Sequence, residues 1–277
     1  MTPLITLTTD FGLDDNFVGV MKGVIARIAP EARTVDISHG VPPQDIAAGA
    51  FLLATAFDYF PPGTIHVVVV DPGVGTRRRA IAVAAGGYYW VAPDNGVLGY
   101  ALARLAATGR LGGCWRAGQW ELAADAQAVE LTEPRYWLPT VSQTFHGRDI
   151  FAPVAAHLAR GVALTALGPA VPSIQALAFP RPTREAQGWR GQVLYVDRFG
   201  NLITNLGAEE LAGRDWAVSL AGRQIPRLSP SYAAMEGLGA LLGSHGFLEI
   251  AVRNGNAAQA LGIGPGAPVL IEPRADA

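Results

Sequence analysis

Two aspartates stand where an open α/β sheet would bind a ligand. Asp10 follows the β-rich run 5–9, and Asp71 follows the apolar run 64–70. Ligands of such sheets sit beyond the carboxyl ends of the strands, so each carboxylate is expected to face a crevice. Capping of the turn that follows the strand is the alternative for either residue, and it stays open at this point.

The second aspartate begins the segment DPGVGT (71–76), which Arg77, Arg78 and Arg79 follow directly. Its proline and two glycines predict a rigid loop that presents backbone N–H groups to a ligand at close range. If strand alternation starts at the arginines, Arg78 points away from its two neighbours, so one of the three can enter the crevice. A solvated charge run is expected for at least two of them.

A third candidate lies in TFHGRDIFAP (144–153), where His146 and Arg148 precede a helical run. Gly147 between them permits close approach of the backbone. For the remaining histidines we expect surface positions; they are His39, His66, His157 and His245.

Metal binding receives little support from spacing. The chain contains no HxH, HExxH or CxxC motif, so a dedicated zinc site is not predicted. Asp10, Asp14 and Asp15 could hold a hard cation, but capping of a helix N-terminus explains Asp14 or Asp15 more simply.

Polar residues among short β-rich runs mark a second group of candidates. The segment DRFGNLITN (197–205) reads as a hairpin in which Asn201 and Asn205 could face a ligand, with a simple turn over Asp197–Asn201 as the alternative. Farther on, GSHGFLEIAV and NGNAA supply Ser244, Glu249 and Asn254. Because Glu249 lies within an apolar strand, it must be exposed or paired.

The elements around these candidates predict two domains. Through about residue 170, β-rich runs alternate with helical patterns, which indicates βα units, so residues 1–178 are predicted to form an α/β domain with a mostly parallel layered sheet. A helix is predicted from Asp45 through Phe57, with Asp45 as its N-cap. The proline-rich polar segment 179–189 reads as a linker, and the short strands of 190–277 as a smaller antiparallel β-barrel.

Composition excludes several classes of protein. The chain has 277 residues, a formal net charge of −2 and 50% hydrophobic residues, so disorder is excluded and a nucleic-acid partner is not expected. The single Cys114 cannot form an intrachain disulfide. The apolar stretch 47–57 is shorter than the roughly 20 residues that span a bilayer, and the N-terminus does not resemble a signal peptide. We therefore expect a soluble cytoplasmic protein without membrane contacts.

Six segments in the same order over almost the whole chain resemble the S-adenosyl-L-methionine hydroxide adenosyltransferases, relatives of the fluorinase and chlorinase. They are TTDFG (8–12), DPGVGT with Arg78, APDNG (92–96), TFHGRD (144–149), DRFGNLITN, and GSHGFLEIAV with NGNAA. The resemblance implies an enzyme that cleaves S-adenosyl-L-methionine with water to adenosine and L-methionine and uses no metal or organic cofactor. It also implies a homotrimer whose sites lie between subunits.

The same resemblance implies roles for individual residues. Asp71, Arg78 and His146 would handle the water, and Asp10 would hold the ribose hydroxyls. The methionine and adenine ends would be bound by residues of the second domain: Asp197, Phe199, Asn201, Asn205, Ser244, Glu249, Val252 and Asn254. Two positions depart from the halogenating relatives, Gln44 in place of a ribose-packing Trp and His245 in place of an Arg.

Three alternatives remain at this stage. A halide-using 5′-halo-5′-deoxyadenosine synthase is disfavoured because the halogenating relatives lack the Asp, Arg and His trio and carry an insertion that is missing here. A non-catalytic adenosine or S-adenosyl-L-methionine sensor would use the same pocket. A metal-dependent hydrolase would be built on Asp10, Asp14 and His146.

Overall fold

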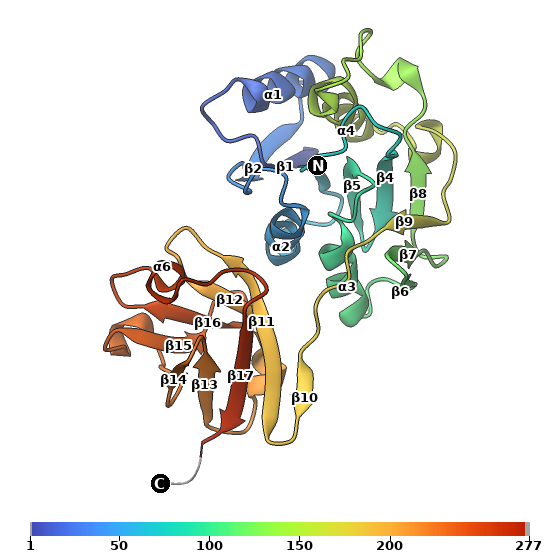
Figure 1. Cartoon of the computed structure of the whole chain (residues 1–277). Coiled ribbons are helices and arrows are strands. Elements are labelled where there is room, and N and C mark those ends of the chain that lie inside the picture. Colours follow the sequence, from blue (N-terminus) through green and yellow to red (C-terminus); the bar gives the residue numbers. More distant parts are fainter. Residues whose placement is uncertain (1, 275–277) are drawn as a thin grey trace. The chain divides into compact units, whose positions relative to one another are not determined.

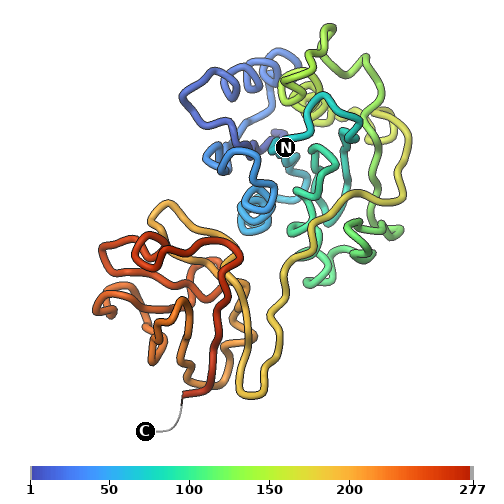
Figure 2. Tube along the Cα trace, viewed as in Figure 1, coloured from blue at the N-terminus to red at the C-terminus, as the bar shows by residue number. Residues whose placement is uncertain are grey.

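The computed structural model describes residues 2–274 and divides the chain into two compact units, Met1–Phe179 and Pro180–Ala277 (Figure 1). The Cα trace passes from the first unit to the second once (Figure 2). Within the segment that the sequence suggests as a linker, β10 (Thr183–Glu185) pairs with β11 (Gly188–Val196).

The first unit is built on a six-stranded mixed sheet with the order β2-β1-β3-β5-β4-β8. Pairings among β2, β1, β3 and β5 are parallel, whereas β4 pairs antiparallel with β5 and with β8. The strands are β1 (Leu4–Thr9), β2 (Arg33–Ser38), β3 (Ile65–Val69), β4 (Ala80–Ala85), β5 (Tyr88–Pro93) and β8 (Gln127–Glu130). The predicted α/β class and its largely parallel sheet are confirmed.

The antiparallel part of the sheet has a local cause. Gly86 and Gly87 form the two-residue connection between β4 and β5, with φ of +61° and +86°. Tight hairpin turns of this kind need positive φ at both central positions, which glycine adopts without steric cost. The two strands are therefore a hairpin and not two arms of a βαβ unit.

Helices cover the sheet in two pairs, α1 with α4 and α2 with α3. Residues of α1 and α4 share one core with Ile5, Val67 and Val69 of the sheet. On α2, Gly49 lies directly against Val70, where a Cβ atom would overlap the valine side chain. The helices are α1 (Phe17–Ile28), α2 (Ile46–Ala56), α3 (Gly99–Ala107) and α4 (Ala152–Ala159).

The two predicted helix caps have opposite outcomes. Asp45 caps α2 as predicted, because its Oδ1 accepts a hydrogen bond of 2.9 Å from the Ala48 N–H. For α1 the expected cap, Asp14 or Asp15, is wrong. The N-cap position there is Asn16, whose side chain makes no capping hydrogen bond.

Shorter elements complete the first unit. A three-stranded sheet has the order β6-β7-β9, and single helical turns lie between the larger elements. They are η1 (Phe57–Tyr59), β6 (Cys114–Arg116), β7 (Gln119–Glu121), η2 (Pro134–Tyr136), the π-helical η3 (Gly147–Phe151), η4 (Leu164–Ala166) and β9 (Ser173–Gln175).

The second unit is an antiparallel sheet that curls into a nearly closed barrel, as predicted. Its order is β14-β13-β17-β11-β12-β16-β15, and the two end strands contact each other. Inward-facing apolar side chains such as Val193, Leu206 and Val269 fill the interior. The remaining elements are β12 (Leu202–Gly207), α5 (Ala208–Leu211), β13 (Trp216–Leu220), β14 (Arg223–Ile225), η5 (Tyr232–Ala234), β15 (Leu238–Leu242), β16 (Phe247–Val252), α6 (Ala257–Leu261) and β17 (Pro268–Pro273).

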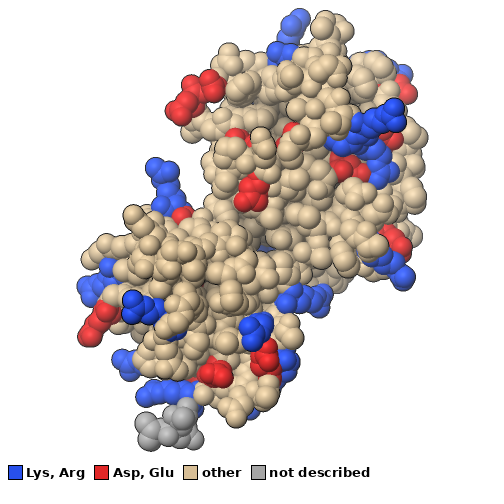
Figure 3. Space-filling view, in the orientation of Figure 1, with Lys and Arg blue, Asp and Glu red and all other residues tan. Residues whose placement is uncertain are grey.

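Over residues 2–274, no helix combines the length and the apolar character that crossing a bilayer requires. On the face shown in Figure 3, Lys and Arg side chains are dispersed among Asp and Glu and do not gather into one basic patch.

Candidate functional site

Asp10 and Asp71 lie at the same edge of the first sheet. Asp10 directly follows Thr9, the last residue of β1. Asp71 is separated from the end of β3 by the single residue Val70. The two strands are parallel neighbours with Thr9 opposite Val69, so their carboxyl ends coincide. Both aspartates therefore lie at the carboxyl edge of the sheet, where ligands of open α/β sheets usually bind.

Asp71 forms a buried ion pair with Arg78. The Arg78 Nε donates to both carboxylate oxygens at 3.0 and 2.9 Å, and Nη2 donates to Oδ2. The Asp71 side chain is 5% exposed and that of Arg78 is 11% exposed. The guanidinium also stacks on the Phe151 ring, 5.4 Å from its centroid. Because the pair is largely shielded from water, removing either partner would leave an uncompensated charge in the interior.

The glycines of the DPGVGT loop make this pair possible. Gly75 has a φ of +78°, and a Cβ atom there would overlap the carbonyl oxygen of Gln143. The hydroxyl of Thr76 closes the turn by donating to the Gly73 carbonyl at 2.7 Å. The loop is therefore packed tightly against the segment that leads to His146.

His146 completes a chain of three side chains. Its Nδ1 lies 2.8 Å from the Arg78 Nη2. A guanidinium can only donate, so Nδ1 accepts and the ring proton of the neutral imidazole is assigned to Nε2. Burial and the positive charge of Arg78 hold the pKa of His146 below its usual 6.5. At neutral pH the site thus holds a neutral imidazole beside the Arg78 cation.

Asp149 anchors the segment that carries His146. Its carboxylate is completely buried and accepts from the N–H and the hydroxyl of Ser142, at 2.8 and 2.7 Å, and from the Arg148 Nε at 2.5 Å. Burial acts to raise the pKa of Asp149, but the bonds from Arg148 and Ser142 outweigh it and lower the pKa. The Arg148 guanidinium is therefore engaged in an ion pair with Asp149.

The expectation that at least two of the three arginines after the loop are solvated is corrected. Of the three arginines after the loop, Arg77 is exposed, but Arg79 is not simply solvated. Its Nε donates to Asp94 at 2.7 Å and its Nη2 to the Ser173 carbonyl at 3.0 Å. Burial raises the pKa of Asp94, opposed by its bonds from Gln175 and Arg79.

The surface positions expected for His39 and His66 are wrong, because both side chains are buried. His66 lies in β3, where both faces of the sheet are covered, and its ring packs against Phe57, Tyr88 and Trp90. Burial lowers its pKa to about 3.

Asp10 accepts a hydrogen bond of 2.7 Å on Oδ2 from the backbone N–H of Gln44. Among the described residues, no three of the His, Cys, Asp and Glu side chains come together as a metal-binding group. The alternative based on Asp10, Asp14 and His146 therefore has no assembled ligand set.

The candidates in the second unit fall into two groups, the first at the β11–β12 hairpin. Asp197 Oδ1 accepts from the N–H groups of Phe199 and Asn201, each at 2.9 Å, and Oδ2 accepts from the Asn201 side chain at 2.9 Å. The Phe199 ring is left 76% exposed. Asn205 is buried and spans two backbone groups, the Gln192 N–H and the Pro180 carbonyl.

The second group lies along β15, β16 and the loop after them. Glu249 is buried and accepts from the hydroxyl of Tyr232, which the sequence did not single out. Burial and this bond raise the pKa of Tyr232, so its hydroxyl stays protonated. Val252 is half-buried, and Ser244 and Asn254 are exposed. Glu249 is thus the paired residue that its apolar strand requires.

Sequence reasoning missed Ser142, Asp149, Asp94 and Tyr232 as members of these networks. Asp149 and Asp94 stand inside the motifs TFHGRD and APDNG, so motif membership is a signal that could have found them. Tyr232 carries no such signal, because it lies in η5, 17 residues before Glu249, and the fold brings the two together.

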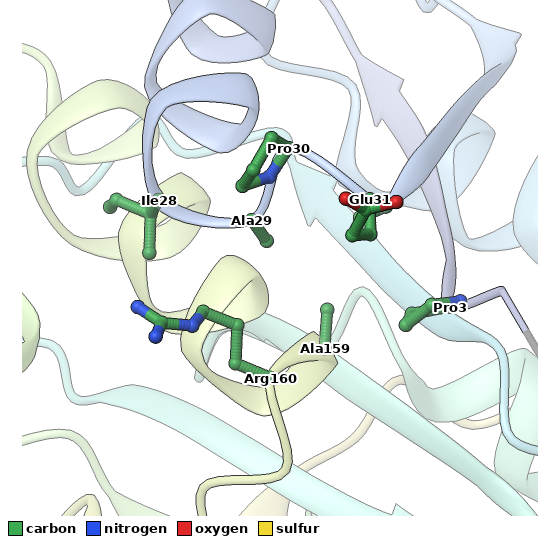
Figure 4. Close-up of a pocket in the computed structure, with 8 residues that line it drawn as sticks. Pro3, Ile28, Ala29, Pro30, Glu31, Ala159 and Arg160 are labelled. Carbon is green, nitrogen blue, oxygen red and sulfur yellow. The ribbon is translucent and has the colours of Figure 1, made fainter.

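A separate cavity of about 330 Å³ lies at the opposite edge of the sheet, where Pro3 precedes β1 and where α1 and α4 end (Figure 4). Glu31 and Arg160 are its charged lining residues, and it contains none of the candidates above.

Comparison with known proteins decides the family. The model of the SAM hydroxide adenosyltransferase N-terminal domain matches residues 5–168, and that of the C-terminal domain matches residues 191–270. The chain belongs to this family. Its N-terminal match holds Asp10, Asp71, Arg78 and His146, and its C-terminal match holds the candidates from Asp197 to Asn254.

Relatives within the family are similar over nearly the whole chain. A protein named (R)-S-adenosyl-L-methionine hydrolase from Salinispora arenicola is 43% identical over 96% of both chains, and one of the same name from Thermus thermophilus is 41% identical over 97% of this chain and 99% of the other. A fluorinase from Nocardia brasiliensis is 26% identical over 90% of both. The crystal structure of an uncharacterized conserved protein from Thermotoga maritima has a TM-score of 0.83, 35% identity, and covers 97% of this chain and 99% of its own.

Proposed function

We propose that the protein hydrolyses S-adenosyl-L-methionine to adenosine and L-methionine by attack of water on the ribose C5′. The observation that carries the proposal is the hydrogen-bonded chain from the shielded Asp71–Arg78 pair to the partly buried His146. Family membership and the names of two relatives that are 41% and 43% identical support the same activity.

The reaction needs an activated water and no acid for the leaving group. As the O–C5′ bond forms, the C5′–S bond breaks and its electron pair neutralises the sulfonium, so methionine leaves as a thioether. The water loses one proton overall. Since free water has a pKa of about 15.7, the site must stabilise negative charge as it develops on the attacking oxygen.

In this mechanism the three side chains have separate tasks. His146 donates from Nε2, and Arg78 donates from Nη1, which bonds to no other described residue. Asp71 holds the guanidinium in place and accepts the proton through a lone pair that Arg78 leaves free. His146 is a donor here and not the base, because its Nδ1 already accepts from Arg78.

Substrate binding is the second part of the proposal. Asp10 holds the two ribose hydroxyls, which keeps C5′ in line with the attacking water. The residues of the second unit bind the rest of the substrate, with Asp197, Phe199 and Asn201 on one hairpin and Ser244, Glu249, Val252 and Asn254 on the neighbouring strands. Asn205 contributes by fixing the backbone around them, since both ends of its amide are taken by backbone groups.

The proposals for the oligomeric state and the cellular location of the protein rest on its resemblance to the family. We propose a homotrimer with sites between subunits and a cytoplasmic location, without an added metal or organic cofactor. Light scattering on the purified protein measures the assembly directly.

The relatives' names also specify a configuration, and we propose that the R epimer at sulfur is the substrate. The experiment incubates the protein with each resolved epimer and follows adenosine and methionine by chromatography, with His146→Ala as the matched control. Adenosine from the R epimer supports the proposal. Adenosine from the S epimer alone contradicts the epimer assignment, a halogenated nucleoside in excess chloride or fluoride indicates a synthase, and binding without product indicates a sensor.

A further inference from the structure

The backbone of Gln44 adopts a conformation that glutamine rarely has. Its φ is +66°, in the left-handed region where a Cβ atom meets the backbone. The N–H of this same residue makes the 2.7 Å hydrogen bond to Asp10 Oδ2. Its side chain is exposed.

The surrounding loop maintains this conformation. Pro42 and Pro43 precede Gln44 with ring-restricted φ, and Asp45 follows it as the N-cap of α2. The Asp45 N–H donates to the Pro42 carbonyl at 3.1 Å, which closes the chain around Gln44. The left-handed backbone at Gln44 lets its N–H face Asp10 while the next residue, Asp45, caps the helix.

The end of β1 and the loop after it are joined to the loop after β2 at two further points. The Gly12 N–H donates to the His39 carbonyl at 2.8 Å, and the Thr9 hydroxyl meets the His39 Nδ1 at 2.8 Å. Within residues 2–274, Asp10 Oδ1 receives no hydrogen bond. One oxygen of Asp10 is therefore held by the protein and the other is open to a ligand.

We propose that Gln44 is a positioning residue for ribose binding, and that it acts through its left-handed backbone and not through its side chain. The Gln44 N–H fixes the rotation of the Asp10 carboxylate so that its free oxygen meets the ribose hydroxyls. The inference rests on the proposed role of Asp10, and the experiment separates the two.

The test measures affinities for adenosine and 2′,3′-dideoxyadenosine by calorimetry in three variants of Gln44. Gln44→Val places a β-branched residue where φ is positive, so it should lose the conformation and weaken adenosine binding about tenfold, the effect of one hydrogen bond to a charged group. Binding of the dideoxynucleoside should change less than about threefold, because it lacks the hydroxyls that Asp10 holds. Gln44→Gly and Gln44→Asn accept positive φ and should retain adenosine affinity within about threefold.

Ala117 supplies a matched control, since it has a φ of +48° in the turn between β6 and β7. Ala117→Val introduces the same strain away from Asp10 and should leave both affinities unchanged. The inference is overturned if Gln44→Val binds adenosine normally, if all three Gln44 variants lose affinity equally, or if Gln44→Val weakens both nucleosides alike.

Asp10→Asn distinguishes failure of the inference from failure of the proposed ribose contact. If this variant binds adenosine weakly while Gln44→Val does not, Asp10 keeps its role and only Gln44 loses its own. If Asp10→Asn binds adenosine normally, both assignments fall.

Discussion

The ion pair of Asp71 and Arg78 should be separable into a part that stabilises the fold and a part that supports turnover. Asp71→Asn leaves a guanidinium that is 11% exposed without its counter-charge, and Arg78→Met leaves a carboxylate that is 5% exposed without its own. Breaking a buried pair on one side costs about 3–5 kcal/mol. Because Arg78 keeps His146 and the Phe151 ring as partners, we expect the low end, about 3 kcal/mol, for Asp71→Asn.

The double variant Asp71→Asn/Arg78→Met replaces the pair with neutral groups of similar size, which is often close to neutral for stability. We therefore expect it to be more stable than either single variant, with a coupling free energy of at least about 2 kcal/mol. All three variants should lose about 10²-fold or more in kcat.

Urea unfolding followed by circular dichroism measures the stabilities, and chromatography of adenosine measures kcat. Additive losses of stability, or single variants within about 1 kcal/mol of the wild type, would refute the description of a coupled buried pair. A double variant that retains turnover would show that water is activated elsewhere.

Three further predictions concern histidines. His146→Ala should lower kcat by about 10²-fold and leave adenosine affinity within about threefold, and a loss of affinity without loss of kcat would contradict its role as a donor to the attacking oxygen. Protonation of His146 Nδ1 removes the acceptor that Arg78 needs. We therefore expect kcat to be constant just above pH 6.5 and to fall only as the pH drops through a pKa below 6.5. A fall in kcat centred at or above pH 6.5 would contradict this assignment. His66 is neutral in the folded protein down to about pH 3, whereas the unfolded chain binds a proton below about 6.5. The free energy of unfolding should therefore fall by about 1.6 kcal/mol from this group between pH 6.5 and 5, and His66→Phe should lack this component in urea titrations at both pH values.

The positions of the candidate site residues in the first unit could be predicted from the sequence because these residues come just after strands or just before a helix. Asp10 and Asp71 each end a recognisable β-rich run, and His146 precedes a helical one, so topology alone brings them to one edge. The pairing of Arg78 with Asp71, seven residues away, is also local, since the glycine loop folds back on itself.

Burial and contacts that depend on residues distant in the sequence could not be predicted in this way. His66 looked like a surface residue, but a strand covered on both faces buries every side chain regardless of type. The hydroxyl of Tyr232 in η5 and the carboxylate of Glu249 in β16 are 17 residues apart and meet only in the folded chain. The direction of β4 depended on a two-glycine turn, which overrides the alternation of strands and helices.

The central claim is that water attacks the ribose C5′, and the fate of its oxygen tests this directly. The purified protein is incubated with S-adenosyl-L-methionine in ¹⁸O-enriched water, and the products are examined by mass spectrometry. Attack at C5′ places the label in the 5′-hydroxyl of adenosine and leaves methionine unlabelled. Unlabelled adenosine, or labelled homoserine with methylthioadenosine, would contradict the mechanism.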